Sequence, residues 1–195
     1  MCRTTPGGDM QPELVQRARA GDHDAFSVLV RASLPRLYAL ANHILRDQDR
    51  AQDAVQDALV LAWRHVRALR DADAWDAWLY RTTVRACYRH ARKEKRRDLV
   101  ELELQPGHDR PGTFDLARSV VDRDRLVREL GRLPIEQRAV MVLHFHLGLP
   151  LTEAAEILEV PVGTAKSRLH RGLLAVRSAM GAEPDAVARN SERSA

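Results

Sequence analysis

The chain has 195 residues, and its 31 Lys and Arg residues exceed its 27 Asp and Glu residues, which gives a formal net charge of +4 at pH 7. This length suits one ordinary domain or two small ones, and two cysteines, Cys2 and Cys87, are too few for a disulfide framework or a Cys-based zinc site. The N-terminus lacks the apolar core of a signal peptide, and no apolar run approaches the roughly 20 residues that span a bilayer, so we expect a cytoplasmic protein without membrane insertion.

The sequence pattern predicts an all-α fold of two small helical bundles joined by a flexible linker. Ala, Leu and Arg dominate, whereas the alternating runs typical of strands are missing. Pro and Gly residues at 106–112 interrupt the helical pattern. We expect a disordered arm at 1–11, a helical bundle at 12–95, a linker at 96–118, a second helical domain at 119–180 and a flexible tail at 181–195.

The first informative element is an amphipathic helix predicted over 49–66. Asp49, Asp53 and Asp57 recur every four residues with Gln52 and Gln56 between them, on the side facing away from an apolar face. Because an acidic face repels DNA, the functional interpretation is a protein-docking surface. The alternative is an ordinary solvated helix face.

Two tryptophans, Trp75 and Trp78, precede a strongly basic segment. Tryptophan beside arginine is typical of single-stranded nucleic-acid binding, where bases stack on rings while cations hold the backbone. Two tryptophans three residues apart are also typical of core packing, so stacking requires that at least one of the pair is exposed.

The basic segment, residues 81–97, carries eight Lys and Arg residues against Glu94 alone. Spacings of three and four residues place five of its arginines on one narrow stripe of a helix: Arg81, Arg85, Arg89, Arg92 and Arg96. Like charges one turn apart repel, so this basic stripe favours a polyanion such as DNA phosphate as its partner. The alternatives are a solvated basic face and a helix lying on a membrane surface.

Residues 150–180 predict a helix-turn-helix unit. Thr152 begins a helix that runs to about residue 159, the stretch 160–163 ends it, and Thr164 caps the second helix. The apolar residues of the second helix fall within an arc of roughly 80°: Ala165, Leu169, Leu173, Val176 and Met180. Its donors point away from that arc and suit the major groove: Lys166, Ser167, His170 and Arg171. The alternative is an αα-hairpin with a solvated basic face.

Taken in order, these motifs resemble the extracytoplasmic-function (ECF) class of bacterial sigma factors, the promoter-specificity subunits of RNA polymerase. The resemblance covers about residues 13–180. DRAQDAVQDALVLAWR is similar to the polymerase-docking helix of region 2, and WDAWLYRTTVRACYRHARKEKRR to its promoter-melting helix. LGRLPIEQRAVMVLHFHLGLPLTEAAEILEVPVGTAKSRLHRGL resembles region 4.

The resemblance implies a role for each surface. The acidic helix would dock on a coiled coil of the polymerase β′ subunit through Asp49, Asp53, Gln56 and Asp57, and core polymerase contacts would include the β subunit. The loop 69–74, including Asp73, would hold an unstacked base together with Trp75, and Trp78 and the basic stripe would bind the adjacent promoter DNA. The helix from Thr164 would read the upstream element through Lys166, Ser167, His170 and Arg171.

This chain also departs from the family's usual residues. Members commonly carry Asn and then Asp or Asn where this sequence has Arg85 and Arg89, which shifts the expected contacts toward phosphate. The family further implies an anti-sigma factor as a partner and an association with the nucleoid.

Catalysis is not expected, and neither is a cofactor or a metal. The sequence has no Gly-rich phosphate loop after a strand, and it lacks a nucleophile–base arrangement on a supporting sheet. His144 and His146 would point about 200° apart on a helix, which does not suit one metal ion. A second hypothesis is a conventional helix-turn-helix regulator, whose N-terminal bundle senses a ligand or dimerises.

Overall fold

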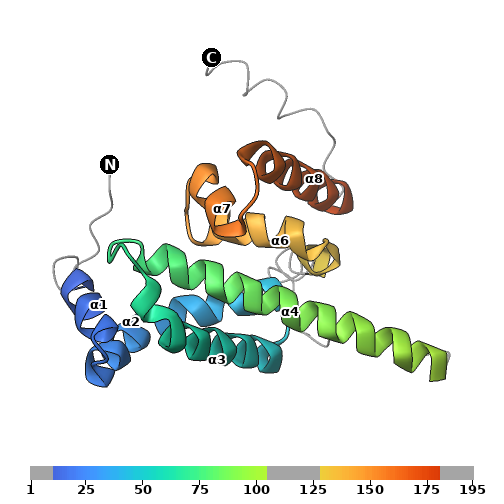
Figure 1. The fold of residues 1–195 in the computed structure, drawn as a ribbon. Coiled ribbons are helices and arrows are strands. Elements are labelled where there is room, and N and C mark those ends of the chain that lie inside the picture. Colours follow the sequence, from blue (N-terminus) through green and yellow to red (C-terminus); the bar gives the residue numbers. More distant parts are fainter. Residues whose placement is uncertain (1–10, 105–127, 181–195) are drawn as a thin grey trace, which may run out of the picture. The chain divides into compact units, whose positions relative to one another are not determined.

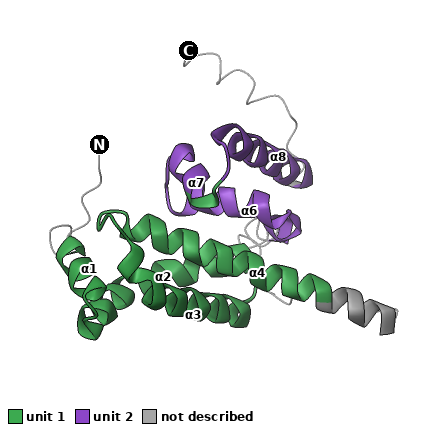
Figure 2. Cartoon of the chain, in the orientation of Figure 1, with its two compact units in different colours: residues 1–98, 157–159 green, residues 99–156, 160–195 purple. Residues whose placement is uncertain are grey.

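The structure, a computed structural model, describes residues 11–104 and 128–180, without the side chains of 97–104 and of residue 180. Within these ranges every regular element is a helix. The chain divides into two compact units, residues 1–98 with 157–159 and residues 99–156 with 160–195 (Figure 2). The predicted all-α fold of two helical units is therefore confirmed. Residues 1–10 of the arm predicted at 1–11, the predicted tail at 181–195, and residues 105–127 of the predicted linker and second domain lie outside the described residues.

The first unit consists of four α-helices and one short 3-10 turn (Figure 1). They are α1 (Gln11–Arg19), α2 (His23–Leu45), α3 (Gln48–His65), the 3-10 turn Val66–Ala68 and α4 (Trp75–Leu104). Helix α2 packs against both α1 and α3. Leu37, Leu40 and Ile44 from α2 and Leu79 from α4 are fully buried, so these two helices supply much of the apolar core.

Side chains of Asp residues begin two of these helices. Asp22 accepts hydrogen bonds from the backbone N–H groups of Asp24 and Ala25 at 2.9 and 3.0 Å, and Asp47 accepts one from Arg50 at 2.9 Å. Both carboxylates therefore satisfy backbone donors that a helix start leaves without a partner. Between α2 and α3 the chain turns at Arg46, which has a φ of 62° and donates its N–H to the carbonyl of Asn42. The connection between the two helices is only two residues long, because Arg46 ends α2 in the left-handed (αL) conformation and the next residue, Asp47, already caps α3.

Helix α4 ends later than the sequence predicted. The first bundle was expected to stop at residue 95 and a linker to begin at 96, but the helix continues to Leu104. The stretch DLVELEL at 98–104 is rich in Leu and Glu, which are strong helix formers, and the first Pro-Gly pair follows only at 106–107. The prediction relied on the end of the basic pattern, whereas backbone propensity carries the helix further.

The second unit contains α6 (Ile135–Met141), the π-helical turn Val142–His146, most of α7 (Leu151–Leu158) and α8 (Val162–Met180). Its core includes Leu133, Met141 and Val176, against which Leu169 and Leu173 pack. Because the π-helical turn replaces the α-helix expected around His144 and His146, the helical angle argued for that pair does not apply. His144 Nδ1 instead lies 2.8 Å from the carbonyl oxygen of Leu149, where it closes the loop that follows the turn.

Helices α7 and α8 both begin earlier than predicted. Helix α7 begins at Leu151, one residue before Thr152, and α8 begins at Val162, so Thr164 lies inside the first turn and is not a cap. The residue with a left-handed backbone is Glu159, at a φ of 55°, and Gly163 is already helical. Pro161 replaces the expected cap, since its carbonyl accepts from the N–H groups of Thr164 and Ala165 and its fixed φ suits a helix start.

Candidate protein and nucleic-acid interfaces

An acidic strip lies along the exposed face of α3. Asp49, Asp53, Gln56 and Asp57 are all exposed. The opposite face of the helix is buried through Ala51, Ala54, Val55, Ala58 and Ala62. The small alanines let α3 lie close to its neighbours, and the 3.6-residue period then leaves the carboxylates in solvent. The structure thus brings together the four residues predicted for protein docking.

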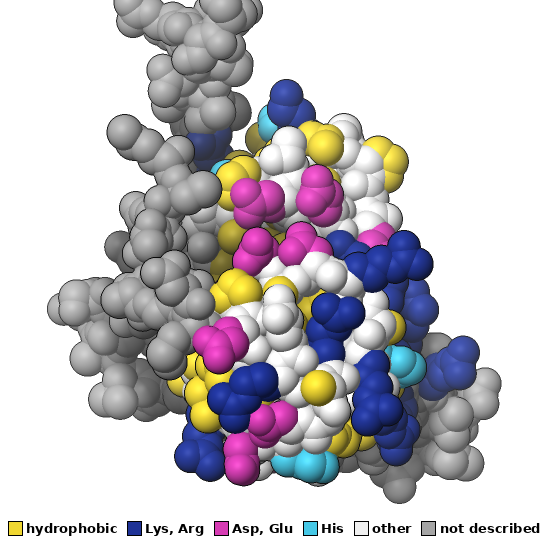
Figure 3. Space-filling model, turned by 60° about the vertical axis from the view of Figure 1, so that its left-hand side comes forward, with side chains coloured by type: hydrophobic (Ala, Val, Ile, Leu, Met, Phe, Trp, Pro, Cys, Tyr) yellow, Lys and Arg dark blue, Asp and Glu magenta, His cyan; other side chains and the backbone are white. Residues whose placement is uncertain are grey.

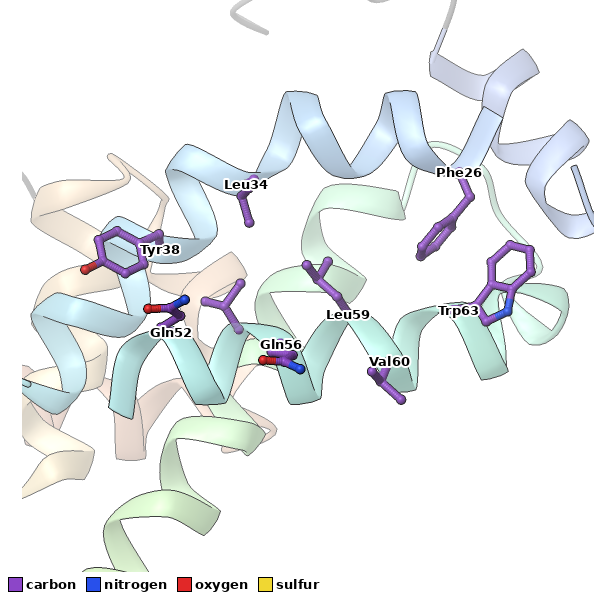
Figure 4. A pocket seen from close by; sticks show the side chains of 9 residues that line it. Phe26, Leu34, Tyr38, Gln52, Gln56, Leu59, Val60 and Trp63 are labelled. Carbon is purple, nitrogen blue, oxygen red and sulfur yellow. The ribbon is translucent and has the colours of Figure 1, made fainter. Parts of the chain in front are cut away.

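Beside the acidic strip, α2 and α3 enclose an apolar groove of about 660 Å3. Figure 4 shows Phe26 and Leu34 of α2 pointing toward Leu59 and Trp63 of α3 across this space. It is lined by Phe26, Leu34, Tyr38, Gln52, Val55, Gln56, Leu59, Val60 and Trp63. Three of these apolar side chains are large and exposed, namely Leu34 at 42%, Tyr38 at 37% and Val60 at 44%. An exposed apolar groove next to polar residues is typical of a protein-binding surface.

This groove was not predicted from the sequence, although Gln56 belongs to both the groove and the acidic strip. The signal was present in α2, where Leu34 and Tyr38 lie one turn apart and face away from the buried pair Leu37 and Leu40. A helix with apolar residues on two faces needs two partners, and here only one face is covered by the rest of the unit.

Helix α4 presents the predicted basic stripe. Arg85, Arg89, Arg92 and Arg96 are exposed and Arg81 is half-buried. The adjacent face is anchored, because Tyr80, Val84 and Cys87 are buried. Burial also raises the pKa of the Cys87 thiol to about 12, which keeps it protonated and unreactive near neutral pH. Figure 3 shows Lys and Arg side chains in several groups on the surface, so the positive charge forms patches and is not spread evenly.

The two tryptophans differ in exposure. Trp75 is fully buried, with its ring centroid 6.0 Å from that of Phe26 and 5.6 Å from that of Trp78. Trp75 therefore packs in the core and cannot stack on a base in this conformation, because Phe26 from a distant part of the chain covers it. Trp78 is half-buried, and Asp73 in the preceding loop is exposed.

Two polar contacts between α3 and α4 were not anticipated. His90 Nε2 lies 2.9 Å from Asp57 Oδ2, and the Arg50 guanidinium pairs with the Glu94 carboxylate. The residues are 33 and 44 positions apart in the chain. No spacing rule within one helix could have linked them, although Glu94 stood out as the single acid in the basic segment.

Helix α8 presents its predicted donors on one side. Lys166, Ser167, His170 and Arg171 are exposed, Thr164 is half-buried, and Ala165 and Val176 are buried on the other side. Arg171 lies back along the helix, donating from Nε to the carbonyl of Ser167 at 3.1 Å. The Ser167 hydroxyl in turn donates to the carbonyl of Thr164 at 2.9 Å. These hydrogen bonds stay within the helix, and the face is exposed to solvent.

Within 11–104 and 128–180, no three His, Cys, Asp or Glu side chains come together as they would around a metal ion. Among those same residues, no helix has the length and apolar character needed to cross a membrane.

Two parts of the chain match models of known protein families. Residues 29–97 match the model of Sigma-70 region 2, and residues 123–176 match that of Sigma-70 region 4. The first match contains α3 and most of α4, and the second contains the helix-turn-helix unit. Two separate sigma regions in this order do not favour the conventional regulator.

Curated relatives are sigma factors as well. The chain is 36% identical over 160 residues to the ECF RNA polymerase sigma factor SigM of Mycobacterium tuberculosis, which covers 82% of this chain and 79% of the relative. It is 29% identical to the ECF RNA polymerase sigma factor SigW of Bacillus subtilis, over 84% of this chain and 92% of that one.

Solved structures show the same fold. The sigma factor RpoE of Bartonella quintana, solved with the anti-sigma factor NepR, gives a TM-score of 0.64 at 24% identity and covers 83% of this chain and 98% of its own. CnrH, solved with the cytosolic domain of CnrY, gives a TM-score of 0.62 at 24% identity, over 88% of this chain and 97% of that one. From its two sigma regions and its identity to SigM, this chain belongs to the ECF family of RNA polymerase sigma factors.

Proposed function

We propose that this sigma factor docks on core RNA polymerase through α3, grips the downstream promoter element through α4 and reads the upstream element through α8. The observation that carries the proposal is the separation of charge within the first unit. Carboxylates line α3 next to an apolar groove, whereas arginines line α4 on the side away from α3. A protein partner and DNA can therefore bind the same unit at different faces.

The docking surface combines two kinds of contact. Cations of the polymerase β′ coiled coil pair with Asp49, Asp53 and Asp57, and apolar side chains of the partner enter the groove near Leu34 and Val60. Exposed ion pairs contribute little free energy each, about 0 to 1 kcal/mol, so the buried apolar area supplies most of the affinity. The carboxylates then fix orientation and speed association.

Promoter opening needs no chemistry from this chain. Phosphate contacts by Arg85, Arg89 and Arg92 release counterions and hold the DNA backbone. Capture of unstacked bases at the loop 69–74 and at half-buried Trp78 offsets an unpairing cost of a few kcal/mol. Binding energy thus opens the duplex, and the factor acts at chromosomal promoters in the nucleoid.

Association with core polymerase tests the docking surface directly. Asp53→Arg combined with Asp57→Arg should abolish co-purification with core polymerase and run-off transcription, because the substitutions place cations against cations. The matched control, Glu13→Arg combined with Glu153→Arg, makes the same charge change at exposed sites outside α3 and should leave both activities intact. Unchanged co-purification of the α3 variant, with its helicity preserved, would refute the assignment.

We also propose an anti-sigma protein as a second partner of this surface. Support comes from the apolar groove and from the fold shared with the sigma factor RpoE, solved with the anti-sigma factor NepR, and with CnrH, solved with the cytosolic domain of CnrY. A protein seated in the groove covers Gln52 and Gln56, so it excludes polymerase by occupying the docking surface. Binding competition between such a protein and core polymerase tests this idea, and simultaneous binding of both to one chain would contradict it.

A further inference from the structure

The outer half of α4 lies beyond the apolar core. Fully or largely buried residues of this helix occur from Trp75 to Cys87, and they include Leu79, Val84 and Ala86. From residue 88 to residue 96, no side chain falls in the buried class. Arg89, Arg92 and Arg96 therefore project from a stretch of helix whose other face is only partly buried.

Two contacts with α3 occur in this stretch. His90 Nε2 lies 2.9 Å from Asp57 Oδ2, and Glu94 pairs with Arg50. His90 and Glu94 are one turn apart on α4, while Asp57 and Arg50 are two turns apart on α3, so the two contacts run in antiparallel order. We call these four residues the α3–α4 clamp.

The clamp lies on the opposite side of α4 from the basic stripe. At 100° per residue, His90 and Glu94 are roughly half a turn around the helix from Arg92. A hold on this side leaves Arg89, Arg92 and Arg96 facing outward. It also opposes the repulsion between arginines one turn apart, which disfavours the helix in this stretch.

We propose that His90 and Glu94 are positioning residues, which fix the outer half of the basic stripe relative to the docking face on α3. The proposal rests on the proposed function, because it assigns the clamp a role in promoter opening. Asp57 then serves twice, as a docking carboxylate and as the partner of His90, whereas Asp53 serves docking alone.

The test is a double-mutant cycle on the charged pair, made in the full chain with Arg50→Met, Glu94→Met and both together. Hydrogen exchange of the backbone amides at 88–96 reports the hold on α4 and needs no polymerase. Each single variant should raise the exchange rate there by about twofold to fivefold, the range expected for an exposed ion pair. In the Arg50→Met background, Glu94→Met should add nothing further.

Promoter opening is the second measurement, followed by fluorescence of a base analogue in the melted strand with the chain bound to core polymerase. Glu94→Met removes the one acid of the basic segment 81–97, so charge alone predicts tighter phosphate binding and faster opening. The positioning role predicts slower opening by about twofold to fivefold at unchanged affinity for core polymerase. His90→Ala should act in the same direction, and the control Arg64→Met, exposed on α3, should change neither measurement.

The outcomes separate the clamp from the proposed function. If exchange at 88–96 is unchanged in both single variants, or if Glu94→Met has its full effect without Arg50, the clamp does not exist. If exchange rises but opening does not slow, the clamp holds the helix without positioning it for DNA, and the proposal is overturned. If the unaltered chain opens no promoter with core polymerase, the proposed function fails, while the exchange measurement still decides whether the clamp forms.

Discussion

The two basic helices of this protein, α4 and α8, are anchored in different ways. Helix α8 crosses α6 at Gly172, where an added Cβ would lie only 2.7 Å from the Sδ atom of Met141. Its apolar residues Leu169, Leu173 and Val176 pack on the core of the second unit. The outer half of α4 has no comparable packing and is joined to α3 by the clamp. Helix α8 is fixed by close packing, whereas the outer half of α4 is held by charged contacts.

This difference matches what each helix has to do. Hydrogen bonds to base edges demand side chains placed to within a fraction of an ångström, and close packing provides that precision. Phosphate contacts tolerate looser placement, because charge acts over several ångströms and the backbone is uniform in sequence. We therefore expect α8 to be sensitive to side-chain volume and α4 to be sensitive to salt and charge.

Filling the crossing of α8 should have the largest effect. Gly172→Leu forces a side chain against Met141 and should lower the free energy of unfolding of the second unit by about 3 kcal/mol, the upper range for overpacking. Gly163→Leu is the matched control, since no atom lies within 4 Å of the position of an added Cβ there. Urea unfolding of both variants checks the prediction, and equal stability of the two would show that the crossing is not close-packed.

Loss of a donor on α8 should come next. Arg171→Ala should weaken upstream-element recognition by about 1 to 3 kcal/mol if the guanidinium contacts a base, because it removes direct readout. Binding of polymerase holoenzyme to promoters with matched and scrambled upstream elements measures the difference. An equal loss on both sequences would mean that Arg171 touches phosphate alone, and the contrast with α4 would disappear.

On α4 the expected change is smaller and uniform across sequences. Arg89→Ala should reduce the slope of log affinity against log salt by about 1, with a similar loss on every promoter, because one phosphate contact is removed. Filter binding of the holoenzyme at several salt concentrations gives the slope. A loss that depends on the downstream sequence would show that Arg89 reads bases, despite its place in a row of arginines.

The sequence was sufficient to predict features that depend on local periodicity. The acidic face of α3 and the donor face of α8 follow from spacings within one helix, and the structure shows both on the exposed sides. Each face is set by which residues are apolar, so no knowledge of distant segments was required.

Features that depend on distant residues were not predictable. Trp75 and Trp78 are alike in sequence, but Trp75 is fully buried with Phe26 packed against its ring, whereas Trp78 is half-buried. His90 comes within hydrogen-bonding distance of Asp57 only when α3 and α4 pack together. The start of α8 was misplaced by three residues, with Pro161 and not Thr164 at the cap position, because Glu159, and not Gly163, adopts the left-handed conformation.

The smallest expected effect concerns Asp47, which caps α3 and also contacts Arg50 of the clamp through its Oδ2 atom at 3.2 Å. The backbone hydrogen bond from Arg50, aided by the charge of its guanidinium, holds the pKa of the Asp47 carboxyl below its usual value. A carboxyl with a lowered pKa in the folded state stabilises fully above the unfolded-state pKa of about 3.9 and loses that contribution as pH falls through the folded-state pKa. Asp47→Asn keeps a capping oxygen but cannot ionise. We expect it to be less stable than the unaltered chain by less than about 1 kcal/mol at pH 7, with the difference shrinking toward pH 3, as measured by urea unfolding. A difference that stays constant with pH would mean that the charge of Asp47 contributes nothing, and that α3 begins through the neutral cap alone.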